Sequence, residues 1–319
     1  MIDGSFMLIV NTIKNKNQIV IILLKMYIEM IEIFEEKKIL SIQDLSCYGQ
    51  CSLTVALPII SAFGIETAVL PSAVLSTHTS GFIDYTFRDL TDDLPFIQEH
   101  WEKEDIYFDA IYTGYIGSIK QLDYIKEIIK SRLKPEGKVF VDPAMADYGE
   151  FYNDFDQNFA DKMGELCKVG DYILPNTTEA CYLLHKPWKS EFTKDEMIDI
   201  ADGLTEFTKK YVILKGDTNK ENKLGTIILD KDEPFSVNVV YNDKIDYLTH
   251  GTGDVFASVF VGASVLGNSP EASAKIAGEF TKKSIEETIK YPTHTYGVKF
   301  ESVIPEIGDL LKKYGSNEN

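Results

Sequence analysis

The sequence has few cysteines, and this shortage excludes two classes of protein. Its four cysteines, Cys47, Cys51, Cys167 and Cys181, form no CxxC pair and no Cys/His pattern with zinc spacing. A chain of 319 residues is also far longer than a small scaffold held together by disulfides. We therefore expect reduced thiols in a cytoplasmic protein.

Basic residues and long apolar runs are also scarce. The chain has 32 Lys and Arg against 50 Asp and Glu, so its formal net charge is −18. This charge argues against nucleic acid or an anionic membrane as a partner. The apolar run at residues 19–24 is too short to span a bilayer, and no small-residue cleavage site follows it.

The first part of the chain differs from the rest. Residues 1–37 lack the regular pattern that begins at Lys38, and we interpret them as an N-terminal extension that is either disordered or translated from a mis-assigned start. No linker rich in Pro, Gly or Ser divides the remainder. We therefore expect residues 38–319 to form a single domain.

Strand patterns alternate with helical patterns along this domain. Such alternation predicts a largely parallel sheet with helices on both faces, and ligands then bind at the carboxyl ends of the strands. A hairpin is expected over residues 225–241, and residues 72–81 are expected to form a ligand-facing loop. The predicted strands are 39–42, 65–70, 109–112, 138–141, 172–175 and 211–214, and the predicted helices include 52–63, 118–133, 270–289 and 302–314.

The segment Gly251-Thr252-Gly253-Asp254 precedes an apolar run and predicts a phosphate site at the start of a helix. Glycines let backbone N–H groups approach a ligand, and the first turn of a helix leaves these donors unpaired. An acid there would repel the anion, so one interpretation is that Asp254 takes a proton from an attacking hydroxyl. The other is that Asp254 caps the helix and the glycines form a turn.

Two common nucleotide motifs are missing. The sequence contains no GxxxxGK[ST], and Gly251-x-Gly253 lacks the third glycine of the dinucleotide fingerprint. The chain is therefore neither a P-loop NTPase nor a classical dehydrogenase.

Other polar residues follow the predicted strands. Asp142 and Glu179, together with Asp254, could organise Mg²⁺ around a nucleotide; alternatively, Asp142 belongs to a turn and Glu179 to the first turn of a helix. Lys215 either reaches phosphate oxygens or is an ordinary surface lysine. Residues 76–80, which include His78, either bind a small polar ligand or form a solvated loop. Tyr115 stacks on a planar ligand or packs in the core.

Taken together, these motifs resemble the ribokinase-like superfamily, and within it the pyridoxal (vitamin B6) kinases. The matching pieces follow the order of that family: residues 39–43 with Gly49, 75–79, 113–115, 141–143, 174–179 and 251–254. The resemblance implies a three-layer α/β/α sandwich with a mostly parallel central sheet. It also implies ATP-dependent phosphorylation of the 5′-hydroxyl of pyridoxal, pyridoxine or pyridoxamine, with Mg²⁺ and K⁺, by a homodimer.

The resemblance also assigns roles to individual residues. Asp254 would be the base, and the backbone of Gly251, Thr252, Gly253 and Asp254 would form an anion hole that also binds ATP. Asp142 and Glu179 would position Mg²⁺ and phosphates, Glu179 through water. Further nucleotide contacts fall on Leu174, Asn176 and Lys215, and vitamin contacts on Asp44, His78, Thr79, Tyr115 and Asp254. Residues 144–153 are expected to be a mobile loop that closes over ATP.

Asp44 departs from the family pattern, because many pyridoxal kinases have a serine at this position. A carboxylate here could accept a hydrogen bond from a protonated ring nitrogen or pair with an amino substituent. It would then shift preference among the three vitamers, or toward an aminopyrimidine.

Three further functions compete with vitamin B6 phosphorylation. A hydroxymethylpyrimidine kinase of thiamine synthesis shares the fold and the Gly-Thr-Gly-Asp segment, but His78-Thr79 and residues 113–115 favour vitamin B6. A non-catalytic vitamin or nucleotide sensor is disfavoured because Gly253, Asp254 and Glu179 are all present. A sugar kinase is disfavoured because the early part of the chain carries no inserted β-lid.

Overall fold

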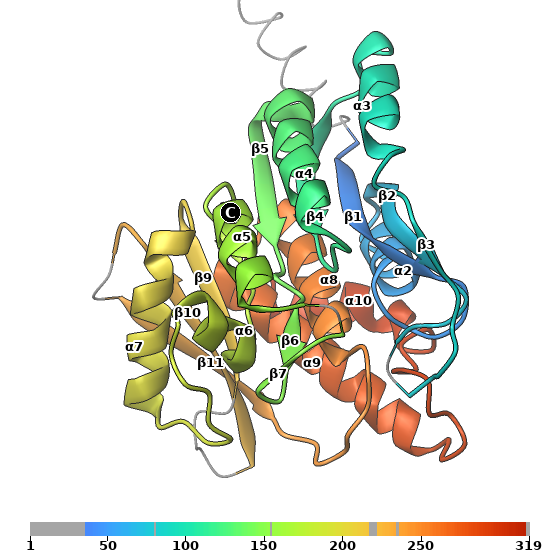
Figure 1. The fold of residues 1–319 in the computed structure, drawn as a ribbon. Coiled ribbons are helices and arrows are strands. Elements are labelled where there is room, and N and C mark those ends of the chain that lie inside the picture. The colour runs from blue at the N-terminus through green and yellow to red at the C-terminus, as the bar shows by residue number, and fades with distance from the viewer. Residues whose placement is uncertain (1–35, 80, 154, 217–221, 234–235, 317–319) are drawn as a thin grey trace, which may run out of the picture. The chain divides into compact units, whose positions relative to one another are not determined.

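A computed structural model describes residues 36–79, 81–153, 155–216, 222–233 and 236–316 (Figure 1). The predicted N-terminal extension therefore lies almost entirely outside the described residues. The fold belongs to the unit formed by Lys38–Asn319.

Among the described residues, one large sheet has the strand order β11-β10-β9-β8-β5-β4-β1-β2-β3. Its central strands are parallel, and β3, β10 and β11 are antiparallel to their neighbours. The predicted mostly parallel sheet is thus confirmed. The strands are β1 (Lys38–Ser46), β2 (Glu66–Leu75), β3 (Phe87–Asp89), β4 (Phe108–Thr113), β5 (Leu133–Val141), β8 (Tyr172–Ile173), β9 (Tyr211–Gly216), β10 (Lys223–Asp230) and β11 (Val237–Asp243).

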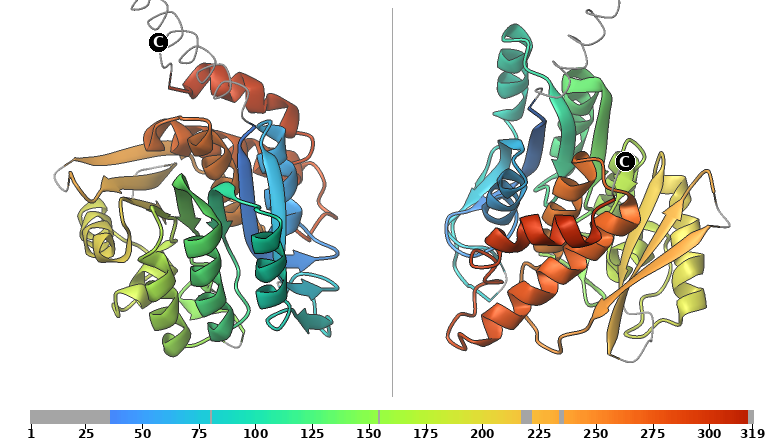
Figure 2. Two further views of the ribbon diagram at one scale, coloured as in Figure 1. Left: turned by 90° about the horizontal axis from the view of Figure 1, so that it is seen from above. Right: turned by 180° about the vertical axis from the view of Figure 1, so that it is seen from behind.

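Helices cover both faces of the sheet, which confirms the three-layer sandwich (Figure 2). One face carries α3 (Leu94–Lys103), α4 (Ile119–Arg132), α5 (Gln157–Cys167), α6 (Thr177–Leu183) and α7 (Lys194–Leu204). The other carries α2 (Leu53–Ala62), α8 (Thr252–Val265), α9 (Pro270–Ile289) and α10 (Ile307–Tyr314). Short 3₁₀ turns lie at Thr205–Phe207 and Ile304–Glu306, and a separate hairpin pairs β6 (Ala146–Asp147) with β7 (Glu150–Phe151).

Alternation along the strands divides the core between the two faces. Leu40 and Ile111 pack toward α4 and α5, whereas Ile39 and Tyr112 pack toward α2 and α8. Helix α8 is buried along most of its length, because α2 and α9 both pack against it. This burial explains its almost uninterrupted apolar sequence.

Several element boundaries differ from the sequence prediction. The expected loop 72–81 begins later, because β2 continues to Leu75; the hydroxyl of Ser72 is buried there and donates to the carbonyl oxygen of Tyr115 (3.2 Å). The expected helix 302–314 begins as a 3₁₀ turn that contains Pro305, and α10 starts only at Ile307. The expected loop 144–153 contains the β6–β7 hairpin.

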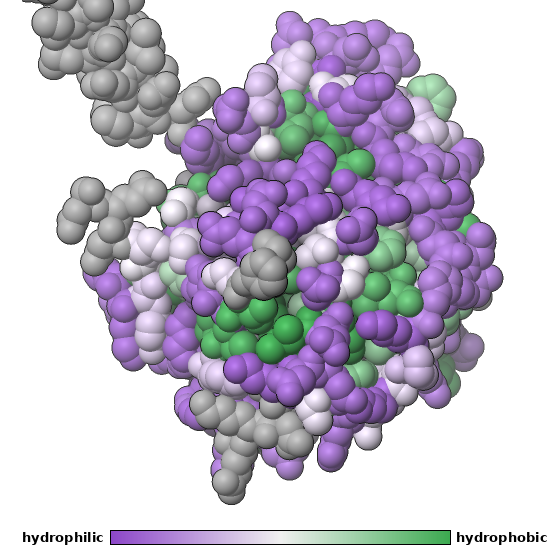
Figure 3. Space-filling model, turned by 90° about the vertical axis from the view of Figure 1, so that its left-hand side faces the viewer, coloured by the Kyte–Doolittle hydropathy of each residue, from purple (hydrophilic) through white to green (hydrophobic). Residues whose placement is uncertain are grey.

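Polar groups dominate one face of the molecule (Figure 3). Figure 3 shows one face, on which hydrophilic residues surround smaller hydrophobic areas.

At the β11 end of the sheet, Lys275 of α9 donates to the carbonyl oxygen of Tyr241 (2.9 Å), and Lys282 pairs with Asp243 (2.6 Å). No helix in the described part of the chain is long and apolar enough to cross a membrane.

The packing of α8 gives a first prediction. Phe260 is fully buried, and its ring contacts those of Phe140, Tyr172 and Phe256. Phe260→Ala is expected to destabilise the protein by about 3–5 kcal/mol in urea unfolding, because it leaves a cavity that its neighbours cannot fill. Phe96→Ala is the control, since Phe96 on α3 is 71% exposed. Equal losses for the two variants would contradict this description of the core.

Candidate active site

The N-terminus of α8 is formed by two glycines with different physical roles. Gly251 has a left-handed backbone (φ 79°), and a Cβ built on it would lie 2.2 Å from the carbonyl oxygen of Gln50. The fold itself therefore requires glycine at this position. A Cβ on Gly253, by contrast, would meet nothing within 4 Å, and its backbone is not left-handed. The absence of a side chain at Gly253 leaves room for a ligand.

The first turn of α8 has no capping side chain, because its N-cap residue is Gly251. The N–H of Val255 bonds to the carbonyl oxygen of Gly251, so the preceding amides of the turn are the ones that can donate to an anion. These amides also lie at the positive end of the helix dipole. The arrangement is suited to binding phosphate.

Asp254 lies at the third position of this turn and is partly exposed. Its Oδ2 accepts a hydrogen bond from the backbone N–H of Ser52 (3.0 Å), so Asp254 caps no amide of its own helix in this contact. Burial, together with the charges of Asp142 and Asp44, raises the pKa of Asp254 to about 7, although the Ser52 N–H and Lys215 act in the opposite direction. A carboxylate with this pKa can accept a proton at neutral pH.

Asp142 and Lys215 are brought together at the ends of two strands. Asp142 follows β5 and Lys215 lies near the end of β9; Lys215 Nζ is 3.2 and 3.3 Å from the two carboxylate oxygens of Asp142. Burial raises the pKa of Asp142, and the charge of Lys215 limits this rise. Burial opposes the charge of Lys215, but Asp142 and Glu179 outweigh it and raise the pKa of the ammonium. Lys215 is therefore no ordinary surface lysine.

Asn176 and Glu179 form a capping box at the start of α6. The Asn176 side chain accepts from the Glu179 N–H (2.9 Å), and Glu179 Oε2 accepts from the Asn176 N–H (2.8 Å). The Met145 N–H donates to Glu179 Oε1 (3.4 Å), so both oxygens of this carboxylate contact backbone amides. Burial, with the charge of Asp142, raises the pKa of Glu179 well above its ordinary value. These contacts match the interpretation of Glu179 as a residue of the first turn of a helix.

The described residues contain no group of three or more His, Cys, Asp or Glu side chains that could hold a metal ion by themselves. Asp142 and Glu179 are close enough for the charge of Asp142 to act on Glu179. Mg²⁺ commonly binds one or two protein carboxylates and completes its shell with waters and phosphates. The two carboxylates fit that mode of binding.

The β6–β7 hairpin is attached to α6. Its turn uses Tyr148 (φ 50°) and Gly149 (φ 84°), and the Gly149 N–H donates to Thr178 Oγ1 (3.1 Å). Tyr182 donates its hydroxyl to the Gly149 carbonyl (2.7 Å) and stacks on Phe151 with ring centroids 3.7 Å apart. The expected loop 144–153 thus contains a hairpin held by polar and aromatic contacts, and its closure over ATP stays a prediction.

The residues predicted to face the vitamin differ in their exposure and in their contacts. His78 is 5% exposed; its ring packs against Gly49, and Nε2 lies 3.1 Å from the carbonyl oxygen of Tyr296. His78 therefore joins its own loop to the C-terminal segment at Tyr296, and it does not lie in a solvated loop. Thr79 and Tyr115 are partly exposed, and the Tyr115 ring lies 5.3 Å from that of Phe155.

The predicted nucleotide contact at Leu174 stays a prediction, and its side chain is not exposed in this structure. Leu174 is 0% exposed and packs in the core on the α8 side of the sheet. The strand pattern correctly placed Leu174 at a strand end, but its side chain points into the core, because the adjacent strands β5 and β9 cover it with apolar neighbours such as Phe140 and Ile213.

Sequence reasoning missed two residues near Asp254 and Lys215. Ser52 donates to Asp254 from a backbone conformation with φ 49° that no sequence pattern indicates. Asp147 lies at the tip of the hairpin, where the charges of Lys215 and His250 act on it. The Asp-Tyr-Gly order at residues 147–149 is a turn signal that could have located Asp147.

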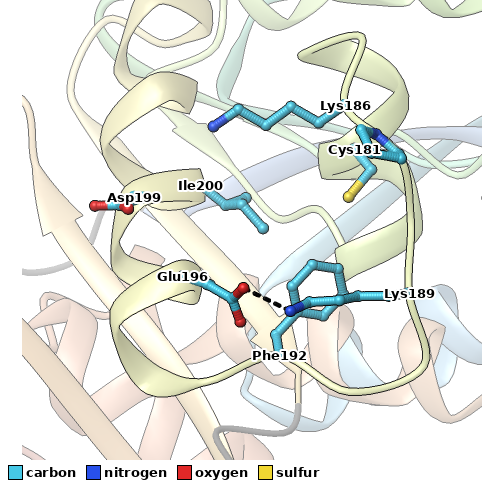
Figure 4. Close-up of a pocket in the computed structure, with 8 residues that line it drawn as sticks. Cys181, Lys186, Lys189, Phe192, Glu196, Asp199 and Ile200 are labelled. Carbon is cyan, nitrogen blue, oxygen red and sulfur yellow. Dashed lines mark hydrogen bonds and ion pairs between the residues drawn. The ribbon is translucent and has the colours of Figure 1, made fainter.

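A pocket of about 310 Å³ lies elsewhere, between the end of α6 and α7 (Figure 4). Phe192 and Ile200 form part of its lining, Lys189 pairs with Glu196 (2.5 Å), and Lys186 and Asp199 lie at its rim. None of the predicted site residues lines it. The pocket is therefore separate from the candidate active site.

Comparison with known proteins identifies a family. A model of the phosphomethylpyrimidine kinase family matches residues 86–299, which is more than half of the chain. Among curated proteins, a pyridoxal kinase of Arabidopsis thaliana is 27% identical over 241 residues, which covers 71% of this chain and 74% of the plant protein.

Solved structures agree with the fold. A Bacteroides thetaiotaomicron protein assigned as a phosphomethylpyrimidine kinase has a TM-score of 0.81 and 33% identity, covering 86% of this chain and 94% of its own. A second crystal form of that protein contains pyridoxal; it has a TM-score of 0.81 and 31% identity, and covers 89% of this chain and 98% of its own. Pyridoxal kinase of Lactobacillus plantarum has a TM-score of 0.79 and 29% identity, covering 88% and 99%.

The raised pKa of Asp254 gives a prediction about stability. Because the folded-state pKa is about 7 against an ordinary value of 3.8, the native state holds a proton more tightly, and stability falls as pH rises from about 4 to 7. Asp254→Asn keeps an acceptor for the Ser52 N–H but cannot ionise. We expect it to stabilise the protein above pH 7 by on the order of 1–2 kcal/mol, after discounting for partial exposure.

Urea unfolding at pH 3, below the unfolded-state pKa, and at pH 8 measures this difference. The gain from Asp254→Asn should be present at the higher pH and should nearly vanish at the lower one. An equal effect at both pH values would show that the carboxylate of Asp254 is not desolvated in the folded protein.

Proposed function

Because the chain belongs to the phosphomethylpyrimidine kinase family, we propose that it is an ATP-dependent kinase that phosphorylates the 5′-hydroxyl of pyridoxal, pyridoxine and pyridoxamine. The observation that carries the proposal is Asp254, a carboxylate with a pKa of about 7 in the uncapped first turn of a buried helix. A base and an anion site lie side by side there. This is the combination that phosphoryl transfer to a hydroxyl requires.

The proposed mechanism uses the two parts of this turn together. Asp254 takes the proton of the 5′-hydroxyl as its oxygen attacks the γ-phosphorus of ATP, and the bond from that phosphorus to the bridging oxygen breaks to release ADP. The amides from Gly251 to Asp254 hold the charge that develops on the transferred group. Lys215, beside Asp142, is placed to contribute positive charge to the phosphates.

Asp142 and Glu179 are the residues we propose for Mg²⁺, with Glu179 acting through water and Asn176 nearby on the nucleotide side. When bound, Mg²⁺ would neutralise charge on the phosphates. Asp142 supplies an anionic group whose existing partner is the Lys215 ammonium, which a cation could replace. The requirement for K⁺ stays a prediction.

The vitamin is favoured over hydroxymethylpyrimidine by the comparisons. A relative with 31% identity binds pyridoxal in its crystal, and two other relatives carry the name pyridoxal kinase. The family model itself is named for the pyrimidine substrate, so this alternative is tested in the same assay. Thr79 and Tyr115, both partly exposed, are the proposed contacts for the ring.

The homodimer, the cytoplasmic location and the separate extension at residues 1–37 stay predictions. Light scattering coupled to gel filtration, on the full chain and on a chain beginning at Lys38, tests the first and last of these together. A dimer in both cases would support a homodimer that does not depend on the extension.

The activity is tested with ATP, Mg²⁺ and K⁺ on pyridoxal, pyridoxine, pyridoxamine and hydroxymethylpyrimidine in parallel. We expect turnover of the vitamers, and a loss of about 10²–10⁴-fold in kcat for Asp254→Asn, because the variant cannot accept the proton. Turnover of the pyrimidine alone would assign the enzyme to the alternative. Vitamin binding without turnover of any candidate would favour the sensor.

Gly253 gives a test of the anion site that leaves the base in place. A methyl group there meets no protein atom, and alanine favours helix, so Gly253→Ala should fold with unchanged or slightly higher stability. We expect kcat/KM for ATP to fall by about tenfold or more, because the methyl group occupies the space next to the amides. Gly308→Ala is the matched control, since Gly308 also has open space and lies in α10. Full activity of Gly253→Ala would show that phosphate does not bind at this turn.

A further inference from the structure

The pocket between α6 and α7 has an apolar interior. Phe192, Ile200 and Cys181 line it and are 7%, 4% and 1% exposed. Figure 4 shows the sulfur of Cys181 and the side chain of Ile200 pointing into the pocket. Burial raises the pKa of the Cys181 thiol, although Lys186 acts in the opposite direction, so the thiol is neutral at pH 7 and behaves as a small apolar group. The interior therefore favours a ligand with an apolar body.

The charged side chains of the pocket leave one cation available to a ligand. Lys189 is paired with Glu196 (2.5 Å), and Asp199 points away from the other lining side chains (Figure 4). Within the part of the chain that the structure describes, no carboxylate pairs with the ammonium of Lys186. Figure 4 also shows Lys186 on the side of the pocket opposite Phe192. An anionic group on the ligand would gain a charge-assisted hydrogen bond from Lys186.

Contacts outside the pocket hold its loop wall in place. The wall is formed by residues 186–192, and Trp188 of this loop donates its Nε1–H to Thr177 Oγ1 (3.4 Å). The Trp188 ring packs so closely on the β6–β7 hairpin that a Cβ built on Gly149 would lie 2.5 Å from it. A capping box at the start of α7 fixes the other end of the loop. The pocket is therefore formed before a ligand arrives, which lowers the entropic cost of binding.

We propose that this pocket is a second small-molecule site and that its ligand is an aromatic carboxylate of one or two rings. The volume of about 310 Å³ lies at the lower end for ligand sites, which limits the number of rings. The ring lies against Phe192 and Ile200, and the carboxylate lies at Lys186. None of the residues proposed for the kinase reaction lines the pocket, so the inference does not rest on the proposed function.

Binding is tested by NMR with indole-3-acetate, which joins a two-ring body to a carboxylate. The protein carries ¹³C at the isoleucine δ1 methyl groups, and the signals of Ile200 and Ile60 are assigned by their loss in Ile200→Val and Ile60→Val. We expect the Ile200 signal to shift and saturate as the probe is added without ATP or vitamin, because this methyl group lies against the bound ring.

Ile60 is the internal control for this titration. It lies on α2 and packs on the opposite face of the sheet from Ile200, so its signal should not move. An Ile200 signal that does not move at millimolar concentrations of the probe would overturn the proposal. Shifts of equal size at Ile200 and Ile60 would overturn it as well, because they would report a general change in the protein.

The anionic character of the ligand is tested at Lys186. This residue is exposed, so Lys186→Gln should fold normally. We expect the affinity for indole-3-acetate to fall about fivefold, as for the loss of a partly exposed ion pair. The affinity for indole-3-acetamide, a neutral molecule of the same shape, should not change.

Lys194→Gln is the matched control, since Lys194 is an exposed lysine of α7 that does not line the pocket. It should bind both probes as the unaltered protein does. Equal losses of affinity in Lys186→Gln and Lys194→Gln, or equal binding of acid and amide to the unaltered protein, would overturn the assignment of an anionic ligand. A protein that binds indole-3-acetate as expected but phosphorylates no vitamer would sustain this inference and reject the proposed function alone.

Discussion

The carbonyl oxygen of Gln50 is held between two glycines, and the geometry of the site depends on this contact. A Cβ on Gly251 would lie 2.2 Å from it and a Cβ on Gly297 would lie 3.0 Å from it. The N–H of Gln50 also donates to the carbonyl oxygen of Tyr296 (3.0 Å). The loop after β1 is thereby fixed against both the start of α8 and the C-terminal segment. Because that loop leads directly into Ser52, the contact also decides where the partner of Asp254 lies.

The parallel sheet supplies the remaining charged groups. Asp44, Asp142 and Lys215 come from β1, from the residue after β5 and from β9, which are distant in sequence but have their carboxyl ends on one edge of the sheet. Several carboxylates lie around one partly buried lysine, Lys215, and burial raises the pKa of each of the acids concerned. The sheet topology alone therefore concentrates negative charge next to a helix terminus that attracts anions, and Lys215 offsets part of it.

Local patterns predicted the elements well, and long-range contacts explain most of what they could not predict. Apolar periodicity placed α9 at residues 270–289 and the strand before Lys215, since both signals lie within one element. The backbone of Ser52 and the enclosure of His78 depend on residues more than 200 positions away, Asp254 and Tyr296 respectively. Leu174 shows the converse limit, because a position at a strand end does not reveal the direction of the side chain.

The contacts between α9 and β11 have a consequence for behaviour at high concentration. An end strand offers unpaired backbone groups to any other chain that can add a strand to the sheet. At β11, the ammonium of Lys275 donates a hydrogen bond to the carbonyl oxygen of Tyr241, and Lys282 and Lys223 form ion pairs with Asp243. A second molecule that approached this end would have to displace a charged side chain before its own backbone could pair. The helix that packs against the strand thus also protects it from intermolecular β-sheet aggregation.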